Sequence, residues 1–167
     1  MEKFTIAVLV RNRFGVLNRV TSMFRRRRFN ISSLSVSETE AEEYSRITLT
    51  SDGGEREKQQ LIDQLHKLED VCFIKELDNN ESVSFELLLV KIKNEPETRN
   101  HIKDAADSYG AETVDFTRDA VILKLTDSTR RINAFIDLMR DYSILEICRT
   151  GVASLERGNT TIRKINI

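Results

Sequence analysis

The sequence predicts an α+β protein made of two tandem ferredoxin-like βαββαβ units. Segments with strand-like alternation and segments with helical periodicity follow one another in the order β-α-β-β-α-β. The same order starts again after residue 81, at a period of about 80 residues. The only plausible linker is the polar, turn-prone stretch 78–81 between the repeats. We therefore expect one domain over residues 1–78 and a second over 82–167.

The first repeat begins with a strand, a helix and a hairpin. Alternating apolar residues predict a strand over residues 3–11, and an apolar face with helical spacing predicts a helix over 15–28. Two further strands are expected over 31–38 and 44–51. The short acidic segment between them, 39–43, predicts a hairpin turn.

The first repeat closes with a second helix and a fourth strand. Asp52-Gly53-Gly54 is a turn signal, and the apolar positions that follow it have helical spacing. These positions are Leu61, Ile62, Leu65 and Leu68. An apolar segment over 71–77 completes the unit as its last strand.

The second repeat follows the same order. Pro96 suits a first helical turn, Gly110 suits the end of that helix, and Asp127-Ser128 offers an N-cap for the next one. The strands of this repeat are expected over 85–93, 112–117, 120–126 and 144–149.

The opening strand of each repeat is apolar on both faces. In the first strand Ile6 and Val8 point to one face, and Ala7 and Leu9 point to the other. Residues that are apolar on both faces imply burial on both faces, whereas the predicted helices cover only one. Since the edge strands would also remain unpaired, we expect a homodimer that extends the sheets side by side.

Composition excludes several classes of function. The formal net charge of -1 gives no bulk attraction to nucleic acid or to a membrane surface. No apolar run approaches the roughly 18 residues of a membrane helix, and the start of the chain lacks a signal-peptide pattern, so we expect a cytoplasmic protein. Cys72 and Cys148 lie on apolar, strand-like segments and are interpreted as small buried residues.

The most informative feature is the junction of the first strand and first helix. Gly15 opens the helix, whose first backbone N–H groups lack partners, and Asn12 precedes it in the turn. The order of elements also suggests that Asn30, at the start of the next strand, lies beside this corner. Such a corner suits a small ligand with a carboxylate. It holds no nucleophile, general base or metal ligand, so it indicates a sensor.

Several motifs resemble the small regulatory subunit of acetolactate synthase, also called acetohydroxyacid synthase. Two of them, RNRFGVLNRV at 11–20 and FNISSLSV at 29–36, are similar to the ACT domain that opens these subunits. QLHKLEDV at 64–71 is quite specific to the family. In the second half, LLVKI at 88–92 and RTGVASLERG at 149–158 look like the family's C-terminal domain. The resemblance covers nearly the whole chain.

The resemblance implies a regulatory subunit without catalytic activity. Subunits of this family bind the catalytic large subunit, raise its activity and confer feedback inhibition by valine in branched-chain amino acid biosynthesis. Thiamine diphosphate, magnesium and FAD are then expected only in the catalytic partner, and no cofactor in this chain. The family's effector sites form where two ACT domains meet. By match, Asn12, Gly15 and Asn30 line this site, with the N–H groups of Gly15 and Val16 on the ligand carboxylate.

Three positions depart from the family pattern. Arg28 stands where a helix-ending glycine is usual, so the helix is expected to close in another way. Arg11 and Arg13-Phe14 make the corner more basic and bulkier than usual. These departures affect which amino acid binds and how tightly.

Other interpretations remain beside this one. The chain can be an amino-acid-sensing ACT protein that regulates a different enzyme. Arg11, Gly15 and Asn30 can mimic an acylphosphatase cradle, although the duplicated architecture argues against it. An RNA-recognition domain would need stacking aromatic residues that the third strand lacks.

The sequence is compatible with more than one role for each of two segments. The run 25–28, four arginines, can be a solvated helix end, a partner contact or, least of all, a nucleic-acid patch. The tail over 158–167 can form a strand or a docking segment.

Overall fold

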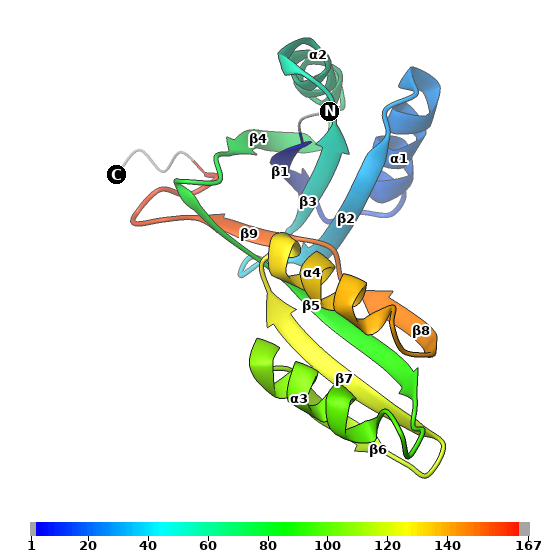
Figure 1. Cartoon of the computed structure of the whole chain (residues 1–167). Coiled ribbons are helices and arrows are strands. Elements are labelled where there is room, and N and C mark those ends of the chain that lie inside the picture. Colours follow the sequence, from blue (N-terminus) through cyan, green and yellow to red (C-terminus); the bar gives the residue numbers. More distant parts are fainter. Residues whose placement is uncertain (1–2, 164–167) are drawn as a thin grey trace. The chain divides into compact units, whose positions relative to one another are not determined.

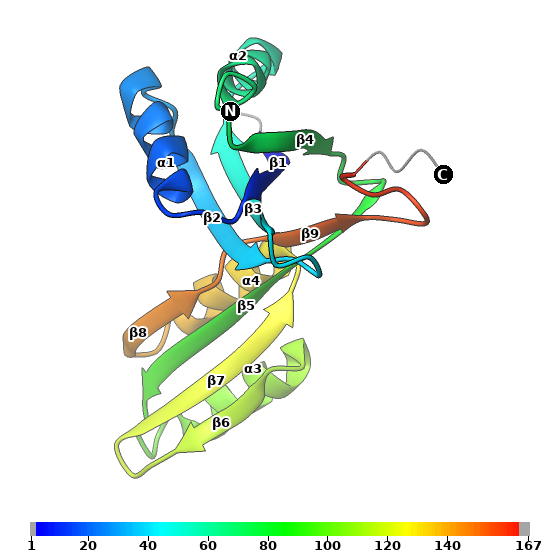
Figure 2. The ribbon, with the colours of Figure 1, turned by 180° about the vertical axis from the view of Figure 1, so that it is seen from behind.

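The structure is a computed structural model that describes residues 3–163 of the 167-residue chain. The chain forms two compact units, whose elements are labelled in Figure 1. The first unit contains the residues up to Val83 together with a C-terminal segment from Val152 onward. The second unit contains Ser84–Gly151. In each unit the helices lie on one face of an antiparallel sheet (Figures 1 and 2).

The first unit has the predicted βαββαβ order. Its elements are β1 (Lys3–Arg11), α1 (Val16–Arg27), β2 (Ile31–Glu38), β3 (Tyr44–Asp52), α2 (Glu55–Leu65) and β4 (Val71–Leu77). The strands are ordered β2-β3-β1-β4, and each neighbouring pair is antiparallel. β1 and β3 are therefore central, and β2 and β4 are edges. This ferredoxin-like arrangement confirms the predicted fold of the first repeat.

The core of the first unit lies between this sheet and its two helices. Val8 of β1 and Phe24 of α1 belong to one buried cluster, and neither side chain is more than 2% exposed. On α1 the buried residues recur at helical spacing, so a single face of the helix meets the sheet. These residues are Val16, Val20, Met23 and Phe24. The packed face fixes α1, and with it the turn between β1 and α1.

The C-terminus of α1 closes at Arg28, whose φ is 57°. The Arg28 N–H donates to the Arg25 carbonyl at 3.3 Å, and the Phe29 N–H donates to the Phe24 carbonyl at 3.1 Å. These two hydrogen bonds form the Schellman motif that usually carries a glycine. The expectation that the helix would close in another way is therefore wrong. Arginine adopts the glycine conformation itself, at a cost of about 1–2 kcal/mol.

Residues 152–163 form a C-terminal strap that lies against the first sheet. The strap begins with β9 (Ala153–Glu156), which pairs with β5 (Ser82–Lys93). Arg46 Nη2 of β3 donates to the Ser154 carbonyl at 2.8 Å, and Lys75 Nζ of β4 lies 3.2 Å from Glu156 Oε1. Burial lowers the pKa of the Arg46 guanidinium, against the opposite effect of the Glu156 and Glu40 carboxylates.

The strap covers the sheet face opposite the helices. Arg46 and Lys75 stand on that face because they lie across from Leu9 and Ala7, which alternate with the core residues of β1. Leu9 and Leu155 of the strap line one cavity of about 600 Å³. Burial on both faces of β1 therefore does not by itself require a second copy of the chain.

The strap also changes the predicted domain boundary. The sequence placed residues 82–167 in the second domain, whereas the structure assigns residues 152–163 to the first unit. The physical reason is the set of polar contacts that the strap makes with β3 and β4. Of the predicted tail segment 158–167, residues 158–163 belong to the strap, and 164–167 lie outside the described residues.

The second unit repeats the architecture of the first. After β5, its elements are α3 (Arg99–Tyr109), β6 (Glu112–Phe116), β7 (Ala120–Asp127), α4 (Thr129–Met139) and β8 (Ile144–Arg149). The strand order is β6-β7-β5-β8, which matches that of the first unit. The core lies between α3, α4 and one face of this sheet. Figure 2 shows the opposite face of the sheet toward the viewer.

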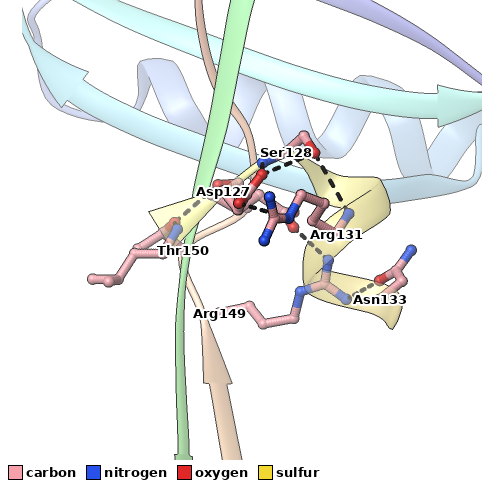
Figure 3. A network of polar contacts seen from close by, with 9 residues as sticks. Asp127, Ser128, Arg131, Asn133, Arg149 and Thr150 are labelled. Atoms are coloured by element: carbon pink, nitrogen blue, oxygen red, sulfur yellow. Dashed lines mark hydrogen bonds and ion pairs between the residues drawn. The ribbon is translucent and has the colours of Figure 1, made fainter. Parts of the chain in front are cut away.

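A buried ion pair ties β5 to β8 in the second unit. The Glu86 side chain is 3% exposed and pairs with Arg149 Nη2. Arg149 Nη1 also donates to Asn133 Oδ1 of α4 at 3.0 Å (Figure 3). Next to this pair, Thr150 Oγ1 accepts from the Leu87 N–H at 3.1 Å. These contacts fix Arg149 and Thr150, the residues just before the strap begins, to β5 and α4.

The N-terminus of α4 is capped as the sequence predicts. Ser128 Oγ accepts the Arg131 N–H at 3.5 Å, and Asp127 Oδ2 lies 3.1 Å from Arg131 Nε (Figure 3). Two other local predictions are wrong. Cys148 of β8 is exposed because it lies opposite Leu89, on the sheet face away from the core, and Cys72 of β4 is half-buried. Pro96 precedes α3, which begins at Arg99.

Candidate functional site

The turn between β1 and α1 and the first residues of α1, together residues 12–18, form an exposed depression that we call the β1–α1 corner. Gly15 precedes the helix with φ of 79°, in the left-handed region that favours glycine. A β-carbon at this position would lie 3.6 Å from the nearest atom, Arg19 Nη1. Space therefore permits a side chain, and the backbone conformation is what disfavours one.

The helix N-terminus at this corner is uncapped. In the part of the chain that the structure describes, no side chain caps α1, and the first turn of this helix carries no acidic residue. Within the described residues, the backbone N–H groups of Gly15, Leu17 and Asn18 have no acceptor. Unpaired N–H groups at a helix N-terminus attract negative charge. The corner therefore presents donors that suit a carboxylate.

Val16 has a smaller role here than the sequence suggests. Its side chain is 3% exposed and belongs to the core of the first unit. Its N–H, expected on a ligand carboxylate, donates to the Arg13 carbonyl at 3.3 Å. In this conformation Gly15 and Leu17 offer freer donors than Val16.

Asn12 bridges the corner to the turn between β2 and β3. Its Nδ2 donates to Glu38 Oε1 at 3.3 Å and to the Glu42 carbonyl at 3.0 Å. Its N–H donates to the Glu43 carbonyl at 2.8 Å. Within the described residues its Oδ1 accepts no hydrogen bond. The two hydrogen bonds of Nδ2 therefore fix the orientation of the Asn12 amide and leave its Oδ1 free to accept a hydrogen bond.

Asn30 lies at the other end of the same sheet. Its Nδ2 donates to Asp52 Oδ2 at 3.0 Å, and its carbonyl accepts from Ser51 Oγ at 2.6 Å. β1 and β2 both run antiparallel to β3, so they are parallel to each other and their starts lie at the same end. On β3, Tyr44 pairs with the end of β1 and Ser51 pairs with the start of β2. These two residues are seven positions apart, which is roughly 23 Å along the strand.

The expectation that Asn30 lies beside Asn12 and Gly15 in one subunit is therefore wrong. Chain order places these residues close in sequence, whereas the parallel direction of β1 and β2 separates them. The sequence also missed the partners that hold the two amides. Glu38 and Asp52 hold them through strand register, which the composition of the segments does not specify.

The corner is flanked by exposed apolar and basic side chains. Phe14 is fully exposed and Leu17 is 44% exposed. Arg11 and Arg13 are exposed beside them. A ligand bound at the Gly15 N–H groups would thus meet apolar surface next to positive charge.

β2 forms a free edge of the first sheet. Its eight residues, ISSLSVSE, include no charge before Glu38 and no proline, the usual devices that block an edge. The other edge, β4, carries Lys75 and Glu76 and lies near β9. β2 is therefore the edge that is open to a second chain.

Within residues 3–163, none of the helices combines the length and apolarity needed to cross a bilayer. The same residues contain no group of three or more His, Cys, Asp or Glu side chains placed to hold a metal ion.

Two protein families match the chain. Residues 6–73 match the family described as "AHAS small subunit-like ACT domain". Residues 85–158 match the family described as "Small subunit of acetolactate synthase". The first match contains the β1–α1 corner and the second contains the Glu86–Arg149 pair.

Curated relatives extend this similarity to almost the full length. A protein of Archaeoglobus fulgidus named "Probable acetolactate synthase small subunit" is 43% identical over 157 residues, covering 94% of this chain and 98% of its own. The "Acetolactate synthase small subunit" of Bacillus subtilis is 39% identical, covering 93% of this chain and 91% of its own.

A solved structure shows the same fold. The acetolactate synthase small subunit of Thermotoga maritima matches with a TM-score of 0.87 at 29% identity, covering 96% of this chain and all of its own. The chain therefore belongs to the family of acetolactate synthase small subunits, the regulatory partners of the catalytic large subunit in branched-chain amino acid biosynthesis.

Proposed function

We propose that this subunit senses L-valine, raises the activity of the catalytic large subunit and confers feedback inhibition on it. The observation that carries the proposal is the uncapped helix N-terminus at Gly15. Its free N–H groups suit the carboxylate of an α-amino acid. The free Oδ1 atom of Asn12 suits the ammonium group, and exposed Phe14 and Leu17 suit an apolar side chain.

A homodimer formed through β2 would complete this site. A two-fold axis perpendicular to the sheet keeps the helices of both copies on one side and places a central β2 residue opposite its own mate. With Leu34 at the centre, Asn30 lies opposite the partner's Glu38. With Ser35 at the centre, it lies opposite the partner's Glu40. In either register Asn30 reaches the end of β2 that the partner's Asn12 contacts.

This arrangement would bring together Asn12 and Asn30, which lie far apart within one subunit. Each site would take Asn12 and Gly15 from one subunit and Asn30 from the other. The dimer would then contain two equivalent sites, and ligand binding would depend on the contact between copies. Such a site can convert binding into a change in how two ACT domains meet.

The turn over 39–43 offers a path from the corner to the strap. On one side Asn12 contacts the Glu42 carbonyl of this turn and the Glu38 side chain just before it. On the other side Arg163 Nη1 lies 3.2 Å from Glu40 Oε1, and its guanidinium stacks on the Tyr44 ring at 4.8 Å. A ligand that engages the Asn12 amide would change the hydrogen bonds of the turn, and the strap would respond through Arg163.

The chemistry of the reaction belongs to the catalytic partner in this proposal. Thiamine diphosphate, magnesium and FAD would be held by the large subunit, and this chain would supply no cofactor ligand. Its contribution is a coupling between effector binding and activity, for which about 1–3 kcal/mol gives several-fold control.

Isothermal titration of the purified full chain with L-valine, L-leucine and L-isoleucine tests the proposal. We expect valine to bind with micromolar to sub-millimolar affinity and Gly15→Asp to abolish binding. Reconstitution with the large subunit then tests activation and feedback. If a different amino acid binds and the large subunit is unaffected, the chain is a sensor for another enzyme. Absence of binding by all three, alone and in the holoenzyme, contradicts the feedback role.

A further inference from the structure

The C-terminus of α1 carries an unusual concentration of positive charge. Arg25, Arg26, Arg27 and Arg28 are consecutive and all exposed. Within the described residues, none of their guanidinium groups has a hydrogen-bond acceptor or carboxylate partner. The helix dipole favours the three arginines of the last turn, Arg25, Arg26 and Arg27, but only by modest amounts. Four neighbouring cations repel one another, so an acidic partner would reduce this electrostatic repulsion.

The opposite charge gathers at the far end of β2. The turn after β2 contains Glu40, Glu42 and Glu43, and β2 itself ends at Glu38. Glu38 and Glu40 contact Asn12 and Arg163. Glu42 and Glu43 are exposed, and their carboxylates have no ion-pair partner within the described part of the chain.

The free edge β2 separates these two charged groups. Figure 1 shows the end of α1 near the start of β2 and the β2–β3 turn at its other end. In an antiparallel pair of β2 strands, the start of each strand lies beside the end of the other. With Leu34 at the two-fold axis, Arg28 lies level with the partner's Glu40. With Ser35 there, it lies level with the partner's Glu42.

We infer that Arg25–Arg28 of one subunit bind the acidic turn, residues 39–43, of a second copy of this chain. This inference rests on the proposed function, in which two subunits pair through β2. It adds the charged groups that favour pairing through this edge over pairing through β4. The two-fold axis forms the ionic contact twice. Pairing through the β4 edges would leave both charged groups unpaired. The contact also lies beside the proposed effector site, so ionic strength should act on dimerisation and on effector binding together.

Charge reversal in the full-length chain tests this contact. One variant carries Arg26→Glu and Arg27→Glu, and a second carries Glu42→Lys and Glu43→Lys. The dimer dissociation constant is measured by analytical ultracentrifugation at 50 and 500 mM NaCl. A control with Arg56→Glu and Lys67→Glu makes the same charge change as the first variant on exposed residues in and just after α2, which contacts β4.

We expect each reversed variant to dimerise at least tenfold more weakly than the wild type at 50 mM NaCl, and the control to dimerise normally. At 500 mM NaCl the difference should shrink, because salt screens exposed charges. Mixing the two reversed variants should restore a heterodimer, since each contact then joins glutamate to lysine or arginine to glutamate. Native mass spectrometry distinguishes it from the homodimers, and recovery in the mixture shows that both variants fold.

Two results would overturn the inference. One is a dissociation constant that neither reversal nor salt changes, with no preference for the heterodimer. The other is an arginine-dependent complex with a DNA duplex in place of the dimer effect. Titration of the wild type with valine tests the proposed function independently of the ionic contact. Valine binding with a charge-independent dimer rejects only the ionic contact, and a charge-dependent dimer without effector binding rejects only the sensor.

Discussion

Asn12 and Asn30 donate hydrogen bonds at opposite ends of the first sheet, Asn12 to Glu38 and Asn30 to Asp52. Each amide is held by an acidic side chain at the end of another strand, Glu38 of β2 and Asp52 of β3, and within the described residues the Oδ1 atoms of both accept nothing. The two amides are therefore oriented but not brought together in one subunit. In the proposed dimer, which aligns opposite ends of β2, the two amides would share a ligand.

We predict that Gly15→Asp abolishes valine binding and that Gly15→Asn weakens it much less. Both side chains tolerate the left-handed region better than most, so the two variants impose similar backbone strain. Only aspartate adds a negative charge where the ligand carboxylate would lie. Titration calorimetry compares the two. Equal losses of affinity would show that shape, rather than charge, controls the corner.

We predict that Arg163→Met preserves valine binding but weakens feedback inhibition several-fold in the holoenzyme. The substitution removes the Glu40 ion pair and the Tyr44 contact while leaving the β1–α1 corner intact. The control is Arg157→Met, because the Arg157 side chain is exposed and, among residues 3–163, it is the backbone N–H alone that is bound, to the Glu81 carbonyl at 2.7 Å. Inhibition curves identical to wild type in Arg163→Met would exclude the strap from the path.

We predict that Arg28→Gly raises the free energy of unfolding by about 1 kcal/mol. Glycine adopts φ near 57° without the steric cost that arginine bears there. Arg27→Gly, one residue earlier in the helix, should instead lower it by about 0.5–1 kcal/mol. Urea unfolding in 500 mM NaCl at fixed subunit concentration measures both, because salt suppresses the charge contribution of either arginine. Destabilisation by Arg28→Gly would contradict the Schellman closure.

We predict that Arg149→Met lowers the free energy of unfolding by about 3 kcal/mol, because it leaves the buried Glu86 carboxylate unpaired. Arg149→Met combined with Glu86→Leu should cost less than Arg149→Met alone, since no buried charge remains. Arg140→Met is the control, because the Arg140–Asp137 pair is largely exposed and contributes at most about 1 kcal/mol. A double variant less stable than Arg149→Met would mean that packing, not charge, dominates at this position.

Local pattern determined most of the fold and half of the candidate site. Alternation in β1 and helical spacing in α1 place these elements within one or two residues of their observed bounds, because each pattern reflects which face is buried. The position of Gly15 before the first helix was also predicted, because the helical spacing begins directly after it. Arg28 shows the limit of such reasoning, because the helix closes there in a conformation that its residue type disfavours.

Tertiary structure alone decided the relations between distant segments. Nothing local to residues 152–163 indicates that they return to the first sheet, because Ser154 and Glu156 gain their partners Arg46 and Lys75 only through the fold. Asn30 is similar, since its distance from Asn12 follows from the parallel direction of β1 and β2. Periodicity depends on burial within one segment, which the sequence carries, whereas register and chain return depend on contacts between segments, which only the folded chain establishes.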